Sequence, residues 1–121
     1  MKKLILSLVL ASSTVCSTIA SAKSDAELMS LAEKNVVTVA QAKALQDETP
    51  ISLTGTLLKH LNKDHYEFQD DTGVIVLEID DDDWKESGVK VGDRVHVLGE
   101  VDTHTYKPTD VEVLKITKLA P

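Results

Sequence analysis

Cysteine is nearly absent from this sequence. The chain of 121 residues has a single cysteine, Cys16, so it cannot close an internal disulfide. This excludes the small secreted folds that depend on several disulfides. Cys16 lies in an N-terminal stretch typical of an export signal, and the mature chain is expected to carry no thiol. A lipid anchor on Cys16 is the alternative. Such sites need a small residue directly before the cysteine and an aliphatic residue three positions before it, but these positions hold Val15 and Ser13.

Aromatic and basic residues are also scarce. The chain has one Trp, two Tyr and one Phe, and 13 Lys and Arg face 20 Asp and Glu, which gives a formal net charge of -7. Proteins bind nucleic acid by neutralising phosphates with basic side chains and stacking bases on aromatic ones. We therefore expect no nucleic-acid partner. Tyr66 and Phe68 alternate with polar residues, so both rings are expected inside the fold.

No apolar run is long enough to span a bilayer, which takes ~20 residues. Residues 1–22 instead have the parts of a cleaved export signal, namely Lys2 and Lys3, an apolar run over residues 4–11 and the small-residue site Ala20-Ser21-Ala22. We expect a periplasmic protein that does not span the membrane. Removing Lys2 and Lys3 would take the net charge from -7 to -9.

Five strands are indicated by apolar residues at every second position. This period places alternate side chains on opposite faces of a sheet. A short helix is predicted after the third strand, with an aspartate at its start and Gly88 at its end. Five strands with a helix at this place is the order of an OB-fold, so we predict a mainly β, closed antiparallel barrel. The strands are expected over residues 51–61, 65–70, 74–80, 94–102 and 110–119.

Three details refine this barrel. Gly55 is expected at a sharp bend of the long first strand. A change in apolar spacing near Leu114 predicts a bulge in the last strand. Trp84, in the short helix, is expected to close one end of the barrel.

Two capping boxes predict helices before the strands. Ser24 and Glu27 form the first, and Thr38 and Gln41 the second, which ends before Pro50. The second helix is expected to pack on the barrel. The predicted organisation is a signal peptide over residues 1–22, a short helical arm over 23–35 and an OB-fold domain over 36–121.

The order of motifs resembles the bacterial OB-fold family of YgiW/YdeI-type proteins. The resemblance rests on Tyr66-x-Phe68-x-Asp70-x-x-Gly73, then Trp84, and finally Val91-Gly92-Asp93 with Gly99-Glu100-Val101-Asp102. It implies a small exported protein associated with tolerance of envelope and chemical stress, which binds ligands without catalysis. The chain departs from this family in an acidic stretch before Thr38 and in a longer segment over residues 103–109. The ligand is therefore left open.

Motifs for catalysis and for metals are missing from the sequence. No nucleophile motif or Gly-rich phosphate loop is present, and we expect neither enzymatic activity nor a cofactor. A calcium loop starting at Asp80 would place Trp84 and Lys85 at its fifth and sixth positions, where an oxygen ligand and a glycine are needed. The histidines come from separate segments, and only His60 and His65 are expected to face each other. We predict no metal site, while weak cation binding by the histidines or by Asp80–Asp83 stays open; the histidines are His60, His65, His96 and His104.

The candidate ligand site is the outer face of the second and third strands with the loop over residues 103–109. Two neighbouring outward valines among polar groups suit a glycan ring, a peptide or a protein surface. The expected partner is a small molecule, a glycan, or a peptide or protein of the cell envelope. The alternative is an acidic protein that sequesters divalent metals or cationic peptides, whose binding would weaken with salt. The candidate residues are His65, Glu67, Gln69, Val74, Val76, Glu78, His104, Tyr106 and Lys107.

Overall fold

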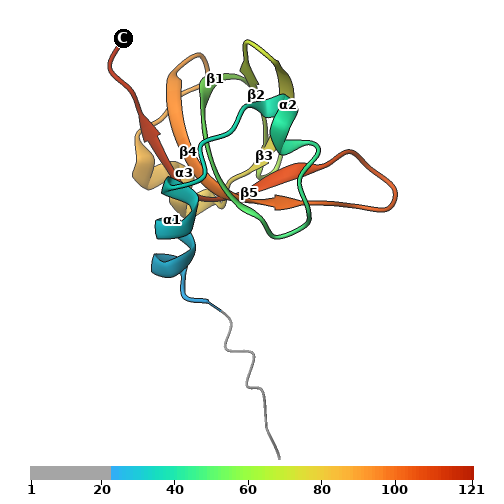
Figure 1. Cartoon of the computed structure of the whole chain (residues 1–121). Coiled ribbons are helices and arrows are strands. Elements are labelled where there is room, and N and C mark those ends of the chain that lie inside the picture. The colour runs from blue at the N-terminus through green and yellow to red at the C-terminus, as the bar shows by residue number, and fades with distance from the viewer. Residues whose placement is uncertain (1–22) are drawn as a thin grey trace, which may run out of the picture.

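Five strands close into a barrel in the order β1-β2-β3-β5-β4 (Figure 1). A computed structural model describes residues 23–121 of the chain, so the predicted export signal lies outside the described residues. The predicted mainly β OB-fold is confirmed, and its strand bounds agree with the prediction to within two residues. The strands are β1 (Pro50–Asn62), β2 (His65–Asp70), β3 (Gly73–Glu78), β4 (Arg94–Asp102) and β5 (Asp110–Lys118).

One strand pair departs from the antiparallel expectation. β3 and β5 run parallel, with Val76 opposite Asp110 and Glu78 opposite Glu112, while the other four pairs are antiparallel. This pair closes the barrel between strands that are far apart in sequence. Alternation within a strand indicates which side chains share a face, but it carries no information about which strand lies alongside it.

β1 serves two neighbours because it bends across the barrel. Its first half pairs with β4 and its second half with β2. Gly55 lies near the exchange, where an added Cβ would overlap the carbonyl oxygen of Gln69 and the ring of Phe68. A glycine is thus required here because β2 approaches β1 closely. This reason is separate from the bend that was predicted at Gly55.

The barrel interior is filled by the alternating apolar residues. Tyr66 is 3% exposed and Phe68 is fully buried, as predicted, and the inward residues of β3 and β4 pack around them. The bulge predicted near Leu114 is confirmed, because Leu98 lies opposite Lys115 while Gly99 lies opposite Val113. Leu114 is the extra residue of β5.

α3 (Asp81–Ser87) follows β3 and carries Trp84. It ends at Gly88, whose φ of 69° is left-handed, as predicted. Asp80 is the N-cap residue but makes no side-chain capping bond, so the expected aspartate cap is not formed. Trp84 packs partly buried against the core and stacks on Tyr66 with ring centroids 4.3 Å apart, as expected of a side chain that closes this end.

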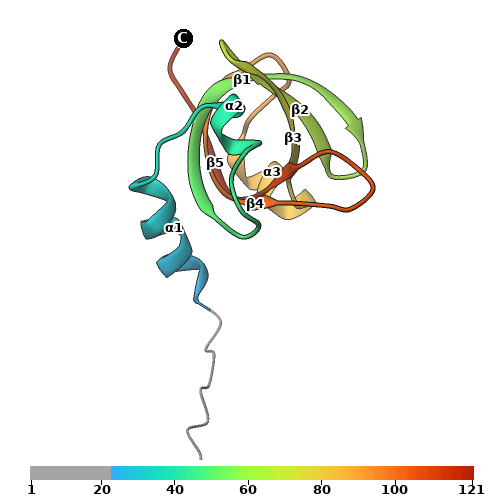
Figure 2. The ribbon, with the colours of Figure 1, turned by 45° about the vertical axis from the view of Figure 1, so that its right-hand side comes forward.

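The two N-terminal helices pack on the barrel differently. α1 (Asp25–Glu33) lies outside the barrel wall against β1 and β4, and it buries Ala32 (Figure 2). α2 (Val39–Ala42) is shorter than predicted, but its Thr38–Gln41 capping box is complete. Its Val39 and Ala42 are fully buried in the core, which confirms packing on the barrel.

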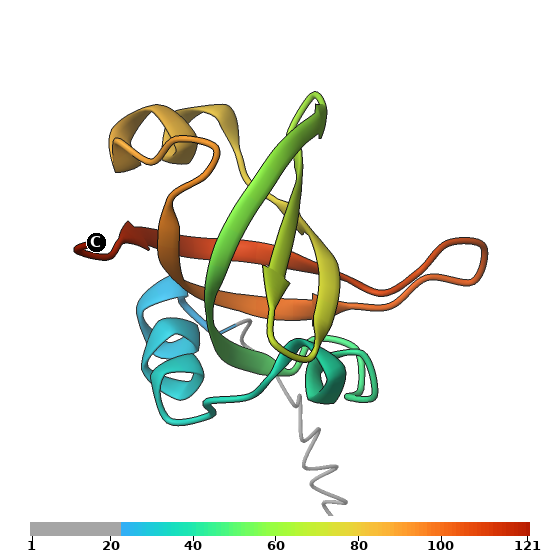
Figure 3. The same cartoon turned by 90° about the horizontal axis from the view of Figure 1, so that it is seen from above.

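Among residues 23–121, no helix is long and apolar enough to cross a membrane. The loop between β4 and β5 projects away from the barrel, on the opposite side from α3 (Figure 3). This loop and the outer face of β2 and β3 frame a hollow of the surface.

Candidate functional site

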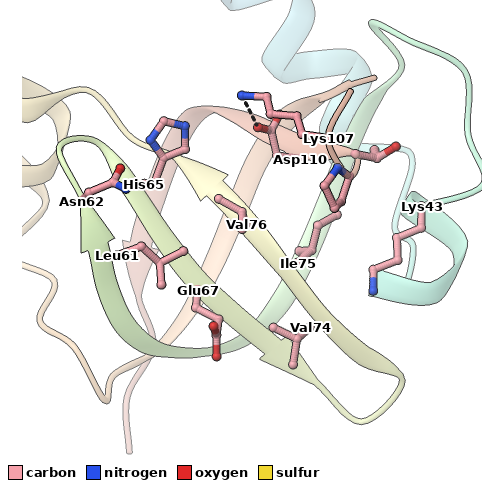
Figure 4. A pocket seen from close by; sticks show the side chains of 12 residues that line it. Lys43, Leu61, Asn62, His65, Glu67, Val74, Ile75, Val76, Lys107 and Asp110 are labelled. Atoms are coloured by element: carbon pink, nitrogen blue, oxygen red, sulfur yellow. Dashed lines mark ion pairs between the residues drawn. The ribbon is translucent and has the colours of Figure 1, made fainter. Parts of the chain in front are cut away.

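A groove of about 530 Å³ lies between the outer face of β2 and β3 and the β4–β5 loop (Figure 4). Its volume is in the range of small-molecule sites, ~300–1,000 Å³. Its lining combines apolar and charged side chains. The residues that line it are Lys43, Leu61, Asn62, His65, Glu67, Val74, Ile75, Val76, Lys107, Pro108, Thr109 and Asp110.

Strand pairing brings the first part of this groove together. Glu67 lies opposite Val76 and Gln69 opposite Val74, so the outward side chains of β2 and β3 form one continuous surface. The valines are half-buried rather than exposed. Glu67 is held by an ion pair with Lys59, whose Nζ lies 3.9 Å from the carboxylate.

The structure places five of the nine candidate residues in the groove, namely His65, Glu67, Val74, Val76 and Lys107. Gln69 is exposed and faces a separate hollow beside Thr54 and Arg94. Tyr106 is 98% exposed in the projecting loop and does not line the groove. Glu78 and His104 lie just beyond the groove, where both approach Asp110.

Sequence reasoning missed several groove residues. Lys43 follows α2, and Leu61 is the last apolar residue of β1, with 41% of its surface exposed. Leu61 could have been found from the sequence, because it is an apolar residue that continues the alternation into the exposed end of its strand. Lys43 gave no such signal, because its position depends on where α2 packs.

Asp110 is the most unusual of the missed residues. It is 3% exposed and is the one charged side chain that is buried among residues 23–121. Its Oδ1 lies 3.1 Å from Nε2 of His104, and its Oδ2 lies 3.9 Å from Nζ of Lys107. A buried carboxylate requires such partners, because burying an unpaired charge is costly.

The histidines are arranged differently from the expectation. His60 and His65 do not face each other, because His60 lies opposite Tyr66 and stacks on its ring at 4.5 Å. His65 and His104 are each half-buried and each lies beside two carboxylates. The expectation that only His60 and His65 come together is therefore wrong. The β2–β3 and β3–β5 pairs bring His65 near Asp110, and the β4–β5 loop brings His104 there.

A row of three glutamates crosses the adjoining strands. Glu78 lies opposite Glu112, which in turn lies opposite Glu100. Burial raises the pKa of each of these carboxyl groups, and neighbouring carboxylates raise it further. The row concentrates negative charge on the outer face of β3, β5 and β4.

Comparison with known proteins finds relatives of the same architecture. A family model described as bacterial OB fold (BOF) protein matches residues 17–118. The calcium-regulated OB-fold protein CarO of Pseudomonas aeruginosa is 38% identical over 88 residues, which are 72% of this chain and 76% of CarO. Protein YgiW of Escherichia coli K12 is 34% identical over 87 residues, which are 72% of this chain and 66% of YgiW.

A solved structure agrees with these sequence matches. The structure of the hypothetical protein ygiW from E. coli aligns with a TM-score of 0.63 at 36% sequence identity. The alignment covers 70% of this chain and 90% of that one.

Proposed function

The chain belongs to the bacterial OB-fold (BOF) protein family, and we propose that it is an exported, non-enzymatic protein that binds its ligand in the groove. The observation that carries this proposal is that five candidate residues, expected on one face of two strands and in one loop, line a single hollow of ligand size. OB-folds use this face of strands 2 and 3 and the adjoining loops for binding.

The lining favours a ligand with both apolar and hydrogen-bonding surfaces. Val74, Val76 and Leu61 offer apolar contact, while Lys43 and Lys107 stand ready to donate hydrogen bonds. A short glycan or peptide of the cell envelope has this mixed character. Binding such a ligand to support envelope stress tolerance is the function that we infer.

The inference of an envelope location is supported by the N-terminal sequence. Lys2 and Lys3, the apolar run and the Ala20-Ser21-Ala22 site together favour export with cleavage after Ala22. The proposed organisation is a signal over residues 1–22, a helical segment over 23–35 and the OB-fold domain over 36–121. An intact mass that begins at Lys23 would support this; a lipid mass on Cys16 would contradict it.

A serine and a histidine in contact could suggest a catalytic pair, but the surroundings of Ser52 and His96 favour a binding role for the protein. Oγ of Ser52 and Nε2 of His96 are 2.6 Å apart. Ser52 is 2% exposed and lies outside the groove, so this pair has no access to a substrate. The bond joins β1 to β4, which pair at this point.

Sequestering of cations is the second candidate function, supported by the row of Glu78, Glu112 and Glu100. Carboxylates held this close attract metal ions or basic peptides. Screening by salt separates the two functions, because the Debye length falls from ~30 Å at 0.01 M to ~8 Å at 0.15 M. Binding of a neutral ligand in the groove changes little over this range, whereas binding to the glutamate row falls steeply.

The test uses an amidated muropeptide without net charge and a polycationic peptide as probes in isothermal titration with the exported protein. We expect the muropeptide to bind with little salt dependence, and Val76→Ser to weaken it about tenfold, which is ~1.4 kcal/mol. Gln69→Ala is the matched control on the same face outside the groove and should bind normally. No muropeptide binding, together with salt-sensitive peptide binding, would reject the groove function in favour of the second one.

A further inference from the structure

Two aspartates face each other at the base of the projecting hairpin. Asp102 is the last residue of β4 and Asp110 the first of β5, and the two are paired in the register. Like charges directly opposite on one face of a sheet are destabilising. The side chain of Asp110 is only 4% exposed and that of Asp102 is 35% exposed, so solvent relieves little of the repulsion. The two negative charges make this a favourable place for a cation.

His104 reaches back from the loop into this position. Its Nε2 lies 3.1 Å from Oδ1 of Asp110 and 3.4 Å from Oδ2 of Asp102. The imidazole is 22% exposed, so its ring is largely fixed against the hairpin. One nitrogen thus converges with two carboxylate oxygens that come from different strands.

These separations are those of ligands around a small metal ion. Zinc binds nitrogen and oxygen at about 2.0–2.2 Å in tetrahedral geometry, which places neighbouring ligand atoms roughly 3.4 Å apart. The donor atoms of Asp102, His104 and Asp110 all lie within 4.8 Å of one another. Small side-chain movements would bring all three onto one ion.

Asp110 also belongs to a neighbouring cluster that contains neither Asp102 nor His104. His65, Glu78 and Asp110 form a second group whose donor atoms also lie within 4.8 Å of one another. Nδ1 of His65 is buried and makes no hydrogen bond, although it lies 3.1 Å from Oδ1 of Asp64. His65 thus already lies beside the Asp64 carboxylate, and its cluster is the rival site that the variants below separate from the first.

We propose that Asp102, His104 and Asp110 bind a divalent transition-metal ion of the zinc class, with a water as the fourth ligand. The imidazole decides the class, because it suits zinc, copper, nickel and iron, whereas calcium takes six to eight oxygens. The site does not depend on the groove ligand, although Asp110 borders the groove.

The ammonium group of Lys107 competes with such an ion for the carboxylate of Asp110. The Lys107 ammonium lies 3.9 Å from Oδ2 of Asp110, and its side chain is 54% exposed, so it is free to move into solvent. An ion that enters the site must displace this weak pair. Removing the lysine charge should therefore strengthen metal binding, which a purely structural cluster of ion pairs would not predict.

The experiment is isothermal titration of the untagged, chelator-treated exported protein with zinc chloride, and with calcium chloride for comparison. We expect one zinc ion per chain, no matching calcium heat, at least about tenfold weaker zinc binding in His104→Gln and tighter binding in Lys107→Gln. His60→Gln, whose ring lies outside both groups, is the control for adventitious histidine binding and should bind as the unmodified protein does.

Three results would overturn the proposal. Unchanged zinc binding in His104→Gln would remove the histidine from the site. Loss of binding in His65→Gln but not in His104→Gln would assign the metal to the other group. Zinc affinity no better than millimolar in the unmodified protein, with all variants folded by circular dichroism, would mean that His104 serves the aspartates only as an ion-pair partner.

Discussion

Phe68 is the residue whose role is most sharply defined by packing. It is fully buried, and its ring contacts the place where a Cβ of Gly55 would lie. Phe68→Ala should open a cavity and cost ~3–5 kcal/mol of unfolding free energy. Val76→Ser, on the outer face, should cost about 1 kcal/mol or less. Urea denaturation measures both, and a stable Phe68→Ala beside an unfolded Val76→Ser would reverse the assignment of strand faces.

Glu112 lies between two other glutamates and should be a source of instability at neutral pH. Burial and the neighbouring Glu78 and Asp102 raise its pKa, so the folded state binds its proton more tightly than the unfolded state does. Stability therefore falls as the pH rises through the pKa of the folded state.

Glu112→Gln should accordingly raise the melting temperature at pH 7, and this gain should shrink as the pH is lowered towards ~4.3, the ordinary pKa of glutamate. Glu86→Gln on α3, outside the glutamate row, is the matched control. Thermal scans from pH 4 to 8 provide the measurement. A gain that stayed constant with pH would show that repulsion is not its cause.

At the scale of elements, Asp70 joins the turn after β2 to α2. Its carboxylate accepts hydrogen bonds from the backbone amides of Val39, Thr72 and Gly73 and from the Thr72 hydroxyl. Burial works to raise the pKa of Asp70, but the hydrogen bonds outweigh it and the pKa lies below its usual value. The ionised carboxylate therefore stabilises the fold above about pH 3.9 and less so as the pH falls through the folded pKa.

Asp70→Ala should cost about 1–2 kcal/mol at pH 7, as loss of a capping residue does, and the difference from the unmodified protein should shrink in acid. The amide of Val39 should also exchange faster with deuterium, because it loses its acceptor. Asp71→Ala, at the neighbouring exposed position, is the control. Unchanged exchange at Val39 would contradict the role of Asp70 in holding α2.

The strands and their faces could be predicted because alternation is a local property of the chain. Tyr66 and Phe68 pointed inward for that reason, and the spacing near Leu114 located the bulge. The grouping of His104 with Asp110 could not be predicted, since it depends on how a loop folds back onto its hairpin. α2 ends at Ala42, although the whole predicted apolar stripe of Val39, Ala42 and Leu45 packs on the core.

At the scale of the whole molecule, negative charge governs the choice of partner. The chain carries -7, and cleavage of the predicted signal would remove two lysines to give -9. The groove also includes the carboxylates of Glu67 and Asp110. Phosphate backbones should be repelled, so we expect no binding of single-stranded DNA or RNA at physiological salt. Fluorescence anisotropy tests this, and saturable micromolar binding would contradict it.

The central claim is that the groove beside β2 and β3 is the ligand site, and amide chemical-shift mapping with the amidated muropeptide tests it most directly. The account predicts saturable amide shifts at Val74 and Val76 and at Lys107, Thr109 and Asp110. It predicts no shifts around Asp80–Asp83. Shifts confined to the hollow beside Thr54 and Arg94, or to the acidic start of α3, would contradict it.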